Sequence, residues 1–348
     1  MAEILEKTYT PKLSPAMAET ETARLQEYVL KNKILDRDYT FYIPTIIGIY
    51  LAYLLTLYLV AISSSYTVVV FLSIIFSIIA VQIAGLMHDA AHLAMFKSYE
   101  MNHIAACLFA ATVGGNYRHW IHKHMKHHDH PNQIGLDGDL EVPFSFTTEH
   151  YLAQTGYMKW LRRYQAWLYV PMCGFLMYAM QLEQNIVHLY KRRFHPLDLG
   201  ISCANIFLWY VMPFLLFGMV KAFIFIPIAT FITGIYLANI FATNHKGMPQ
   251  LSTGTEMSNL EQQITTTRNV SPGSLTDFLF LGLNYQIEHH IYPECPRNKF
   301  KLLVPYLKDL CERTGMPYTV ESAWQSYREI FTDLSQTAKK GQKALKDK

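Results

Sequence analysis

Residues 66–92 read YTVVVFLSIIFSIIAVQIAGLMHDAAH, an apolar run that ends in a pair of histidines. The part from Tyr66 to Met87 contains no charged residue, and about 20 apolar residues suffice to cross a bilayer as a helix. His88 and His92 follow at a spacing of four, so both side chains lie on one face of the same helix. The stretch therefore predicts a membrane helix that presents two imidazoles at its end.

Three further stretches have the same length and composition. The four predicted spans are 41–62, 66–87, 199–220 and 223–243. Because the connections SSS (63–65) and KA (221–222) are short, the spans form two hairpins, and all other segments lie on one side of the membrane. That side carries 29 of the 30 Lys and Arg residues, all but Lys221, which indicates the cytoplasm.

These features predict an all-α membrane protein with four transmembrane helices in two hairpins and a cytosolic, histidine-rich helical cap. We expect an integral, multi-pass protein of a bacterial inner membrane or an equivalent membrane. The predicted division of the chain is a cytosolic N-terminal segment (1–40), a membrane and catalytic domain (41–310) and a cytosolic C-terminal segment (311–348).

The composition agrees with this class. Hydrophobic residues make up 51% and charged residues 16% of the chain, well below the roughly 25% of charged residues in soluble domains. The net charge of only +3 argues against a nucleic-acid partner. Five cysteines without a C-x-x-C pair are typical of free thiols in a reducing compartment.

Two weaker apolar stretches, Ile104–Gly115 and Gln165–Met180, are expected to be interfacial or half-inserted helices. If Gln165–Met180 crossed the membrane fully, the later histidines would face the side opposite to His88 and His92. Arg162 and Arg163, which precede the second stretch, are either lipid headgroup anchors or part of a solvated basic face.

Histidines also gather in two extramembrane segments. HMKHH places His124, His127 and His128 on one helix face, and QIEHH repeats this spacing with a glutamine in the first position. His245 follows directly on the fourth span. The histidines with this placement are His88, His92, His124, His127, His128, His245, His289 and His290. For His119, His122 and His130 the sequence leaves open whether they support ligands, replace them or only form polar surface.

Eight imidazoles are too many for one metal ion and suit two ions of four to five ligands each. Imidazole binds Zn, Cu, Fe and Ni, so the ligand type alone does not identify the metal. A metal pair beside apolar helices suggests a lipid-like substrate. Because the methylenes of such a chain resist hydrolysis, attack on them needs an O2-activating metal, for which iron is the usual choice.

HDAAH (88–92), KHMKHHDHPN (123–132) and LNYQIEHHIYPECPR (283–297) resemble the H-x-x-x-H, H-x-x-H-H and Q-x-x-H-H boxes of the integral-membrane fatty acid desaturase family. The resemblance runs from about residue 40 to 310. It implies a cytosolic di-iron cap, two Fe ions with the eight histidines as ligands, and O2 as co-substrate. It also implies that Gln286, Asp89, Asp137 and Asp139 are ligands or hold ligands in place, although a Gly-flanked turn also explains Asp137 and Asp139.

The same resemblance implies a fatty acyl substrate, either free or bound to CoA, a carrier protein or a lipid. The chain lacks the His-Pro-Gly-Gly signature of relatives with a fused cytochrome b5 domain. We therefore expect a separate electron donor of the ferredoxin, rubredoxin or cytochrome b5 type. The glutamine of the third box does not fix the position of the double bond.

Other functions remain alternatives at this stage. A fatty acid or lipid hydroxylase, or an alkene-forming fatty acid decarboxylase, would use similar boxes and differ in the product. A metal or proton transporter is a distant alternative, because its ionisable residues would lie within the spans. A structural zinc protein would be expected to use cysteine and to close at four ligands.

Overall fold

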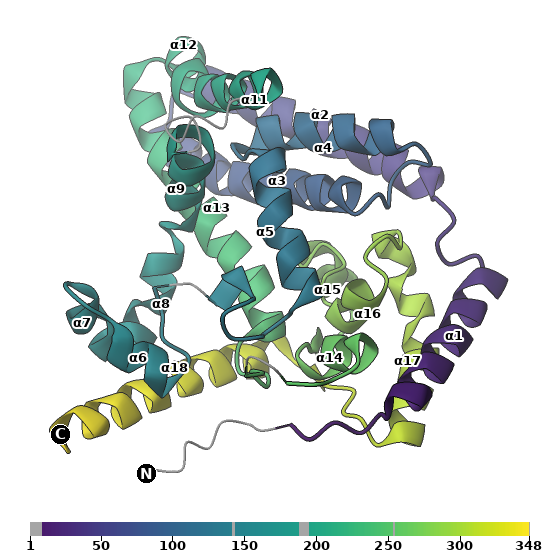
Figure 1. Cartoon of the computed structure of the whole chain (residues 1–348). Coiled ribbons are helices and arrows are strands. Elements are labelled where there is room, and N and C mark those ends of the chain that lie inside the picture. Colours follow the sequence, from purple (N-terminus) through teal and green to yellow (C-terminus); the bar gives the residue numbers. More distant parts are fainter. Residues whose placement is uncertain (1–8, 141–142, 188–194, 253–254, 348) are drawn as a thin grey trace. The chain divides into compact units, whose positions relative to one another are not determined.

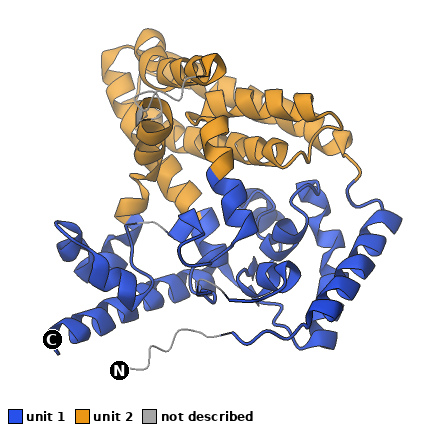
Figure 2. Ribbon diagram, in the orientation of Figure 1, with its two compact units in different colours: residues 1–35, 123–170, 240–348 blue, residues 36–122, 171–239 orange. Residues whose placement is uncertain are grey.

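The computed structural model describes residues 9–140, 143–187, 195–252 and 255–347 (Figure 1). In this part the protein is helical, apart from a two-stranded parallel sheet of β1 (Asn269–Val270) and β2 (Val320–Glu321). The predicted all-α membrane class is confirmed. The chain divides into two compact units: unit 1 comprises residues 1–35, 123–170 and 240–348, and unit 2 comprises residues 36–122 and 171–239 (Figure 2).

Unit 2 contains most of the apolar helices. They are α2 (Tyr39–Ile62), α3 (Tyr66–Ala91), α4 (Tyr99–Val113), α9 (Leu176–Gln181), the π-helical segment η3 (Leu182–Val187), α11 (Pro196–Ile206), the π-helical segment η4 (Phe207–Val211), α12 (Met212–Phe217) and the larger part of α13 (Met219–His245). Four described helices are long and apolar enough to cross a membrane: α2, α3, the run Pro196–Phe217, and α13. The stretches 104–115 and 165–180 are not among them.

The turn between the third and fourth of these helices differs from the sequence prediction. It lies at Gly218, whose φ of 77° is in the left-handed region that favours glycine, and not at residues 221–222. Lys221 therefore belongs to α13. Its Nζ donates to the carbonyl oxygens of Val60 (3.2 Å) and Ala61 (2.6 Å). A lysine at these carbonyls satisfies the otherwise unpaired C-terminal end of α2.

Among the four long apolar helices, α3 has the largest buried share. In α3, 61% of the most apolar window is buried, against 22% in α2. α3 packs against both α2 and α4 within unit 2. The helix ends at Ala91, and its last turn carries His88 and Asp89. The predicted histidine pair thus lies at the end of an inner helix.

Unit 1 is built from shorter helices around one apolar core. Its elements are α1 (Pro15–Lys31), the C-terminal half of α5 (Tyr117–Asp129), η1 (Gly138–Leu140), α6 (Thr148–Ala153), α7 (Met158–Leu161), η2 (Arg162–Tyr164), most of α8 (Gln165–Cys173), α14 (Asn259–Thr265), α15 (Ser274–Leu279), α16 (Gln286–Ile291), η5 (Arg297–Leu302), α17 (Val304–Thr314) and α18 (Ala323–Lys346). The core joins Leu25 of α1, Ile264 of α14, Ile287 of α16 and Leu307 of α17. Ile287 thus fastens α16 into this core.

The segment from α7 to α8 buries its polar side chains and exposes its aromatic ones. Gln165 is fully buried and bonds the backbone of Ser145 and the carbonyl oxygen of Leu334. Arg162 is also buried, donates to the carbonyl oxygen of Tyr151 and stacks on its ring. The interpretation of Arg162 as a headgroup anchor or solvated residue is therefore wrong, because its guanidinium is used inside unit 1. Trp160 and Trp167, in contrast, are 62% and 87% exposed.

Candidate metal centre

Three elements of unit 1 bring histidines together: the C-terminal half of α5, the last residue of α13, and α16. Helical spacing puts His124, His127 and His128 on one face of α5, as the sequence predicted. α16 contributes His289 and His290, and α13 contributes His245. All six are buried. They sort into two groups of three.

The first, the His127 group, consists of His127, His245 and His290. One ring nitrogen of each lies within 4.8 Å of the others. The ring centroids are 4.6 Å apart for His127 and His245, 5.1 Å for His127 and His290, and 4.8 Å for His245 and His290. Each residue comes from a different element, so the group closes a contact between α5, α13 and α16.

The second, the His128 group, consists of His124, His128 and His289, whose ligand atoms meet the same 4.8 Å limit. The Nε2 atoms of His128 and His289 are only 3.2 Å apart. The ring centroids of His124 and His128 are 4.7 Å apart. Adjacent residues on α5 and on α16 thus serve different groups, which explains why both boxes contain two neighbouring histidines.

In unit 2, His88 and His92 place their ring centroids 4.7 Å apart. Asp89, which the sequence grouped with them, accepts a hydrogen bond from the hydroxyl of Tyr42 at 2.8 Å. Its other oxygen is 3.7 Å from Nδ1 of His88, beyond hydrogen-bond distance. Asp89 therefore anchors the end of α3 to α2.

Asp137 orients His127. Both carboxylate oxygens lie 3.0 Å from Nδ1 of His127, and they also accept from the backbone N–H groups of Asn132 and Asp139. Burial would raise the pKa of Asp137, but the hydrogen bond from His127 lowers it to about 2. Burial would lower the pKa of His127, whereas the hydrogen bond and charge of Asp137 raise it. The proton of the His127 ring therefore sits on Nδ1, and Nε2 stays available to bind a metal ion.

Gln263 of α14 does the same for His290. Its Nε2 donates to the carbonyl oxygen of His128 at 2.6 Å, so its Oε1 is the atom that accepts from Nδ1 of His290 at 2.8 Å. One amide thus assigns the tautomer of His290 and ties α14 to α5. No sequence pattern indicates Gln263, because it lies 23 residues before the third box and outside any box spacing.

Gln286, the residue that replaces histidine in the third box, contacts His245. Its Nε2 is 3.0 Å from Nε2 of His245, and its Oε1 accepts from Nδ2 of Asn244 at 2.8 Å. Asn244 therefore fixes the amide so that Gln286 donates to the imidazole. Glu288, between the ligand positions, turns away and bonds Asn269 and Tyr318.

Four residues that the sequence analysis considered lie outside the two histidine groups: Asp139, His119, His122 and His130. Asp139 is 44% exposed at its side chain and pairs with Lys123 at 3.1 Å, while its distance to Nδ1 of His127 is 3.8 Å. His119 is 3.4 Å from Glu183, and His130 bonds Gln133 at 3.1 Å. His122 is exposed. Among the described residues, none of these three histidines belongs to a group that could hold a metal ion.

The donors fit a transition metal. One ring nitrogen of each of His127, His245 and His290 lies within 4.8 Å of the others, close enough to coordinate one ion. The tautomers of His127 and His290 are set by Asp137 and Gln263, and all six donors are imidazoles. Cysteine is absent from every candidate metal-binding group that the described residues form. This all-imidazole donor set suits a transition metal such as iron, copper or nickel and differs from the cysteine-containing sites typical of structural zinc.

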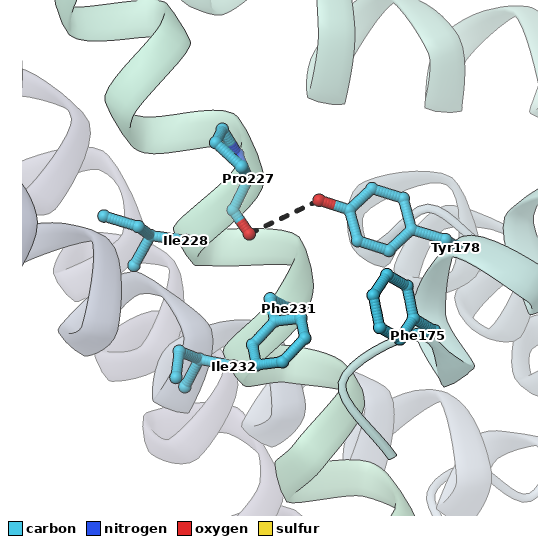
Figure 3. Close-up of a pocket in the computed structure, with 6 residues that line it drawn as sticks. All are labelled: Phe175, Tyr178, Pro227, Ile228, Phe231 and Ile232. Carbon is cyan, nitrogen blue, oxygen red and sulfur yellow. Dashed lines mark hydrogen bonds between the residues drawn. The ribbon is translucent and has the colours of Figure 1, made fainter. Parts of the chain in front are cut away.

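A separate apolar groove lies in unit 2, between α9 and α13. It has a volume of about 590 Å³ and is lined by Phe175, Tyr178, Pro227, Ile228, Phe231 and Ile232 (Figure 3). The hydroxyl of Tyr178 donates to the carbonyl oxygen of Pro227 at 3.4 Å. Its lining is mainly apolar and contains no histidine, so this groove is not part of the metal centre.

Comparison with known proteins identifies relatives over most of the chain. A family model described as Fatty acid desaturase matches residues 63–322. The Delta(5) fatty acid desaturase fat-4 of Caenorhabditis elegans is 28% identical over 284 residues, which cover 74% of this chain and 62% of the relative.

Two further relatives are the Fatty acid desaturase 2-like protein FADS2B of Mus musculus and the Delta(8)-fatty-acid desaturase 2 of Arabidopsis thaliana. The first is 25% identical over 79% of this chain and 57% of its own length, and the second is 27% identical over 82% and 67%. This chain thus spans only about three fifths of the length of the first two relatives.

Proposed function

Because the chain belongs to the fatty acid desaturase family, we propose that it is an oxidoreductase that introduces a carbon–carbon double bond into a fatty acyl chain. The observation that carries this proposal is the pair of buried three-histidine groups in unit 1. Two such groups, joined by shared boxes, suit a two-metal centre better than a single structural ion. The relatives that match are named as desaturases of different double-bond positions, so the position in this case stays open.

We assign the His127 group and the His128 group to two iron ions. His88 and His92 are proposed as further ligands on the strength of the sequence boxes. Iron bound there would supply the oxidation: one O2, two electrons and two protons convert two neighbouring methylenes to an alkene and two waters. The reaction class thus needs both a metal centre and an external reductant.

The residues of unit 1 prepare this chemistry by fixing the ligands. Asp137 and Gln263 hold the protons of His127 and His290 on Nδ1, so that Nε2 of each keeps its lone pair. Gln286 and Asn244 fix the ring of His245. Partners of this kind typically change metal affinity by about 10- to 100-fold when they are removed. Burial of all six imidazoles excludes bulk water from the reacting atoms.

The substrate is proposed to be a fatty acyl chain, and the electron donor a separate protein of the ferredoxin, rubredoxin or cytochrome b5 type. We place the metal centre on the cytoplasmic side of the bacterial inner membrane or an equivalent membrane. Support for this side comes from the distribution of Lys and Arg residues, of which Lys221 alone falls on the opposite side of the predicted spans.

The direct test is analysis of fatty acids from cells that express the protein, beside cells that express the His289→Ala variant. We expect a new acyl species lighter by two hydrogen atoms with the wild type and none with the variant. His150→Ala is the matched control, because His150 bonds Gln154 and belongs to neither group. A product that gains oxygen, or that loses the carboxyl carbon, would replace desaturation by hydroxylation or decarboxylation.

A further inference from the structure

The side chain of Phe300 in η5, a helix at the surface of unit 1, contacts the His128 group. The ring of Phe300 lies 5.6 Å from the ring of His289, centroid to centroid, with the planes at 72°. Phe300 is only 2% exposed, whereas its neighbour Lys301 in η5 is exposed and Lys299 is half-buried. η5 is thus a surface helix whose one buried ring contacts a candidate iron ligand.

The surface around Phe300 is basic. Residues 297–308 contain Arg297, Lys299, Lys301 and Lys308 and no acidic residue. The end of α1 and the turn after it add Lys31 and Lys33, both exposed, and residues 30–35 are also without Asp or Glu. The acidic residues that flank these stretches include Glu294, Asp36 and Asp309, of which Asp309 is paired with Arg313 at 2.8 Å, so the basic residues still outnumber the acidic ones.

Direct contacts show that these two stretches form one surface. The hydroxyl of Tyr28 in α1 donates to the carbonyl oxygen of Leu302 at 3.0 Å, and its ring lies 4.9 Å from the ring of Tyr306, centroid to centroid, with the planes tilted by 35°. Two large apolar side chains are exposed here, Leu30 at 65% and Leu302 at 44%. Exposed leucines among lysines give an apolar centre with a charged rim, the pattern of a protein-binding surface.

We propose that this surface, residues 30–33 and 299–302, docks an acidic one-electron carrier protein, and that Phe300 and His289 conduct its electrons to the metal centre. The proposal rests on the proposed function, which requires two electrons from outside for each double bond. Each docking event would oxidise one carrier by one electron and pass that electron to a metal held by these histidines, so two carriers would be oxidised for each double bond formed. Opposite charges favour fast, transient association of this kind.

The test reverses the charge of the surface with Lys299→Glu/Lys301→Glu. Lys339→Glu/Lys340→Glu on α18 is the matched control, because it changes the net charge equally at two exposed lysines outside the surface. The probes are a reduced acidic ferredoxin and a reduced acidic soluble cytochrome b5, whose oxidation by the iron-loaded full chain is followed by stopped-flow absorbance. Dithionite with methyl viologen serves as a small reductant that needs no docking.

With the protein donors at low salt, we expect the reversal to slow electron transfer by about tenfold or more, and the difference to shrink at high salt. The control should stay within twofold of wild type, and the small reductant should reduce all three proteins equally. Equal loss with protein and small donors, or no loss with either protein donor, would overturn the proposal. So would an unchanged donor rate with a raised KM for acyl-CoA, which would assign the lysines to an acyl headgroup.

Failure of the proposed function has a different signature. In that case the wild-type chain, reduced anaerobically with the small reductant and then mixed with O2 and the acyl substrate, forms no alkene. An active wild type with unchanged rates in the reversed variant contradicts only the docking surface.

Discussion

Asp137 and Asp139 show how two neighbouring carboxylates with the same sequence context take different roles. Asp137 is buried, accepts from two backbone N–H groups and holds Nδ1 of His127. Asp139 lies at the surface beside Lys123. The depressed pKa of Asp137, about 2, means that its carboxylate is ionised over the whole physiological range. A glycine-flanked turn alone would need neither this burial nor this charge.

We predict that Asp137→Asn weakens iron binding by about 10- to 100-fold, because the amide cannot accept from His127 and from both backbone N–H groups at once. The measurement is iron retained by the purified protein during titration with a chelator, read by mass spectrometry. Asp139→Asn is the control and should change the affinity less than threefold. Equal losses in the two variants would show that the turn, and not the contact with His127, is what matters.

For Gln286, the sequence predicts its place near the metal ligands but not the residue that it contacts. Its place among the ligands follows from helical spacing, and it is indeed buried beside the His127 group. Its contact with His245 could not be predicted, because the two residues are 41 positions apart and come from different helices. The amide of Asn244, which decides how Gln286 is oriented, carries no sequence signal at all.

At the scale of elements, Arg268 secures the end of α13. It is fully buried, and its guanidinium donates to the carbonyl oxygens of Thr243 and Lys246, on either side of His245. A third contact, 2.5 Å, reaches Glu329 of α18. Carbonyls at a helix end have no partner within the helix, so Arg268 acts as a cap that also fixes the direction of the last turn.

We predict that Arg268→Lys lowers both thermal stability and iron content, because an ammonium group lacks the planar, forked geometry that reaches two carbonyl oxygens and the carboxylates of Glu329 and Glu321. The loss of stability should be about 2 to 4 kcal/mol, as for other buried networks that lose a partner. Thermal unfolding and iron analysis of the same preparation measure the two effects. Arg328→Lys, at an exposed position of α18, should change neither. Iron content equal to wild type in Arg268→Lys would separate the cap from the metal centre.

The segment from α7 to α8 is unusual because its aromatic side chains are exposed and its polar side chains are buried. Tyr157, Trp160, Tyr164 and Trp167 recur at helical spacing and are 43% to 87% exposed, while Arg162 and Gln165 are buried. Aromatic side chains with a polar edge are enriched at membrane–water interfaces. This placement supports the sequence prediction of an interfacial helix, although the exposed stripe begins at Tyr157 rather than at Gln165.

We predict that Trp167 lies in the lipid headgroup region. In nanodiscs with lipids brominated near the headgroup, a variant that keeps only Trp167 should lose at least half of its fluorescence. A variant that keeps only Trp324, which is 78% exposed on α18, is the control and should be quenched much less. Equal quenching of the two tryptophans would contradict an interfacial role that is specific to this segment.

For the whole molecule, local patterns predicted the helices and the ligands but not the contacts that assemble unit 1. The spans and the histidine boxes depend on periodicities within one helix, which are visible in the sequence. The assembly depends on pairs such as Asn132, whose amide donates to the carbonyl oxygens of His245 and Thr266. Such pairs join segments more than 100 residues apart, and no local rule selects them.

The start of the described chain belongs to the same assembly. Glu261 of α14 is fully buried and accepts from the hydroxyl of Tyr9 and from the backbone N–H groups of Lys12 and Leu13. α14 also carries Gln263, which holds His290. The N-terminal segment is therefore connected through one short helix, α14, to a candidate iron ligand. Conditions that loosen the contacts of this segment should weaken metal binding.

Glu21 provides the way to test this connection by pH. Its carboxylate bonds both terminal nitrogens of Arg313 in α17, at 3.0 and 3.1 Å, and this contact lowers its pKa below the ordinary value of 4.5. A carboxyl group with a lowered pKa stabilises the folded state fully above about pH 4.5 and loses this contribution as the pH falls through the lowered value. Glu21→Gln removes the contribution at neutral pH.

We therefore expect Glu21→Gln to lower the Tm by about 2 °C at pH 7 and to match the wild type more closely at each step below pH 4.5. Glu27→Gln, at an exposed position of the same helix, is the control and should follow the wild type at every pH. If α1 supports the metal centre through the core of unit 1, Glu21→Gln should also release iron to a chelator faster than Glu27→Gln at pH 7. A lowered Tm with unchanged iron release would confine Glu21 to the stability of α1.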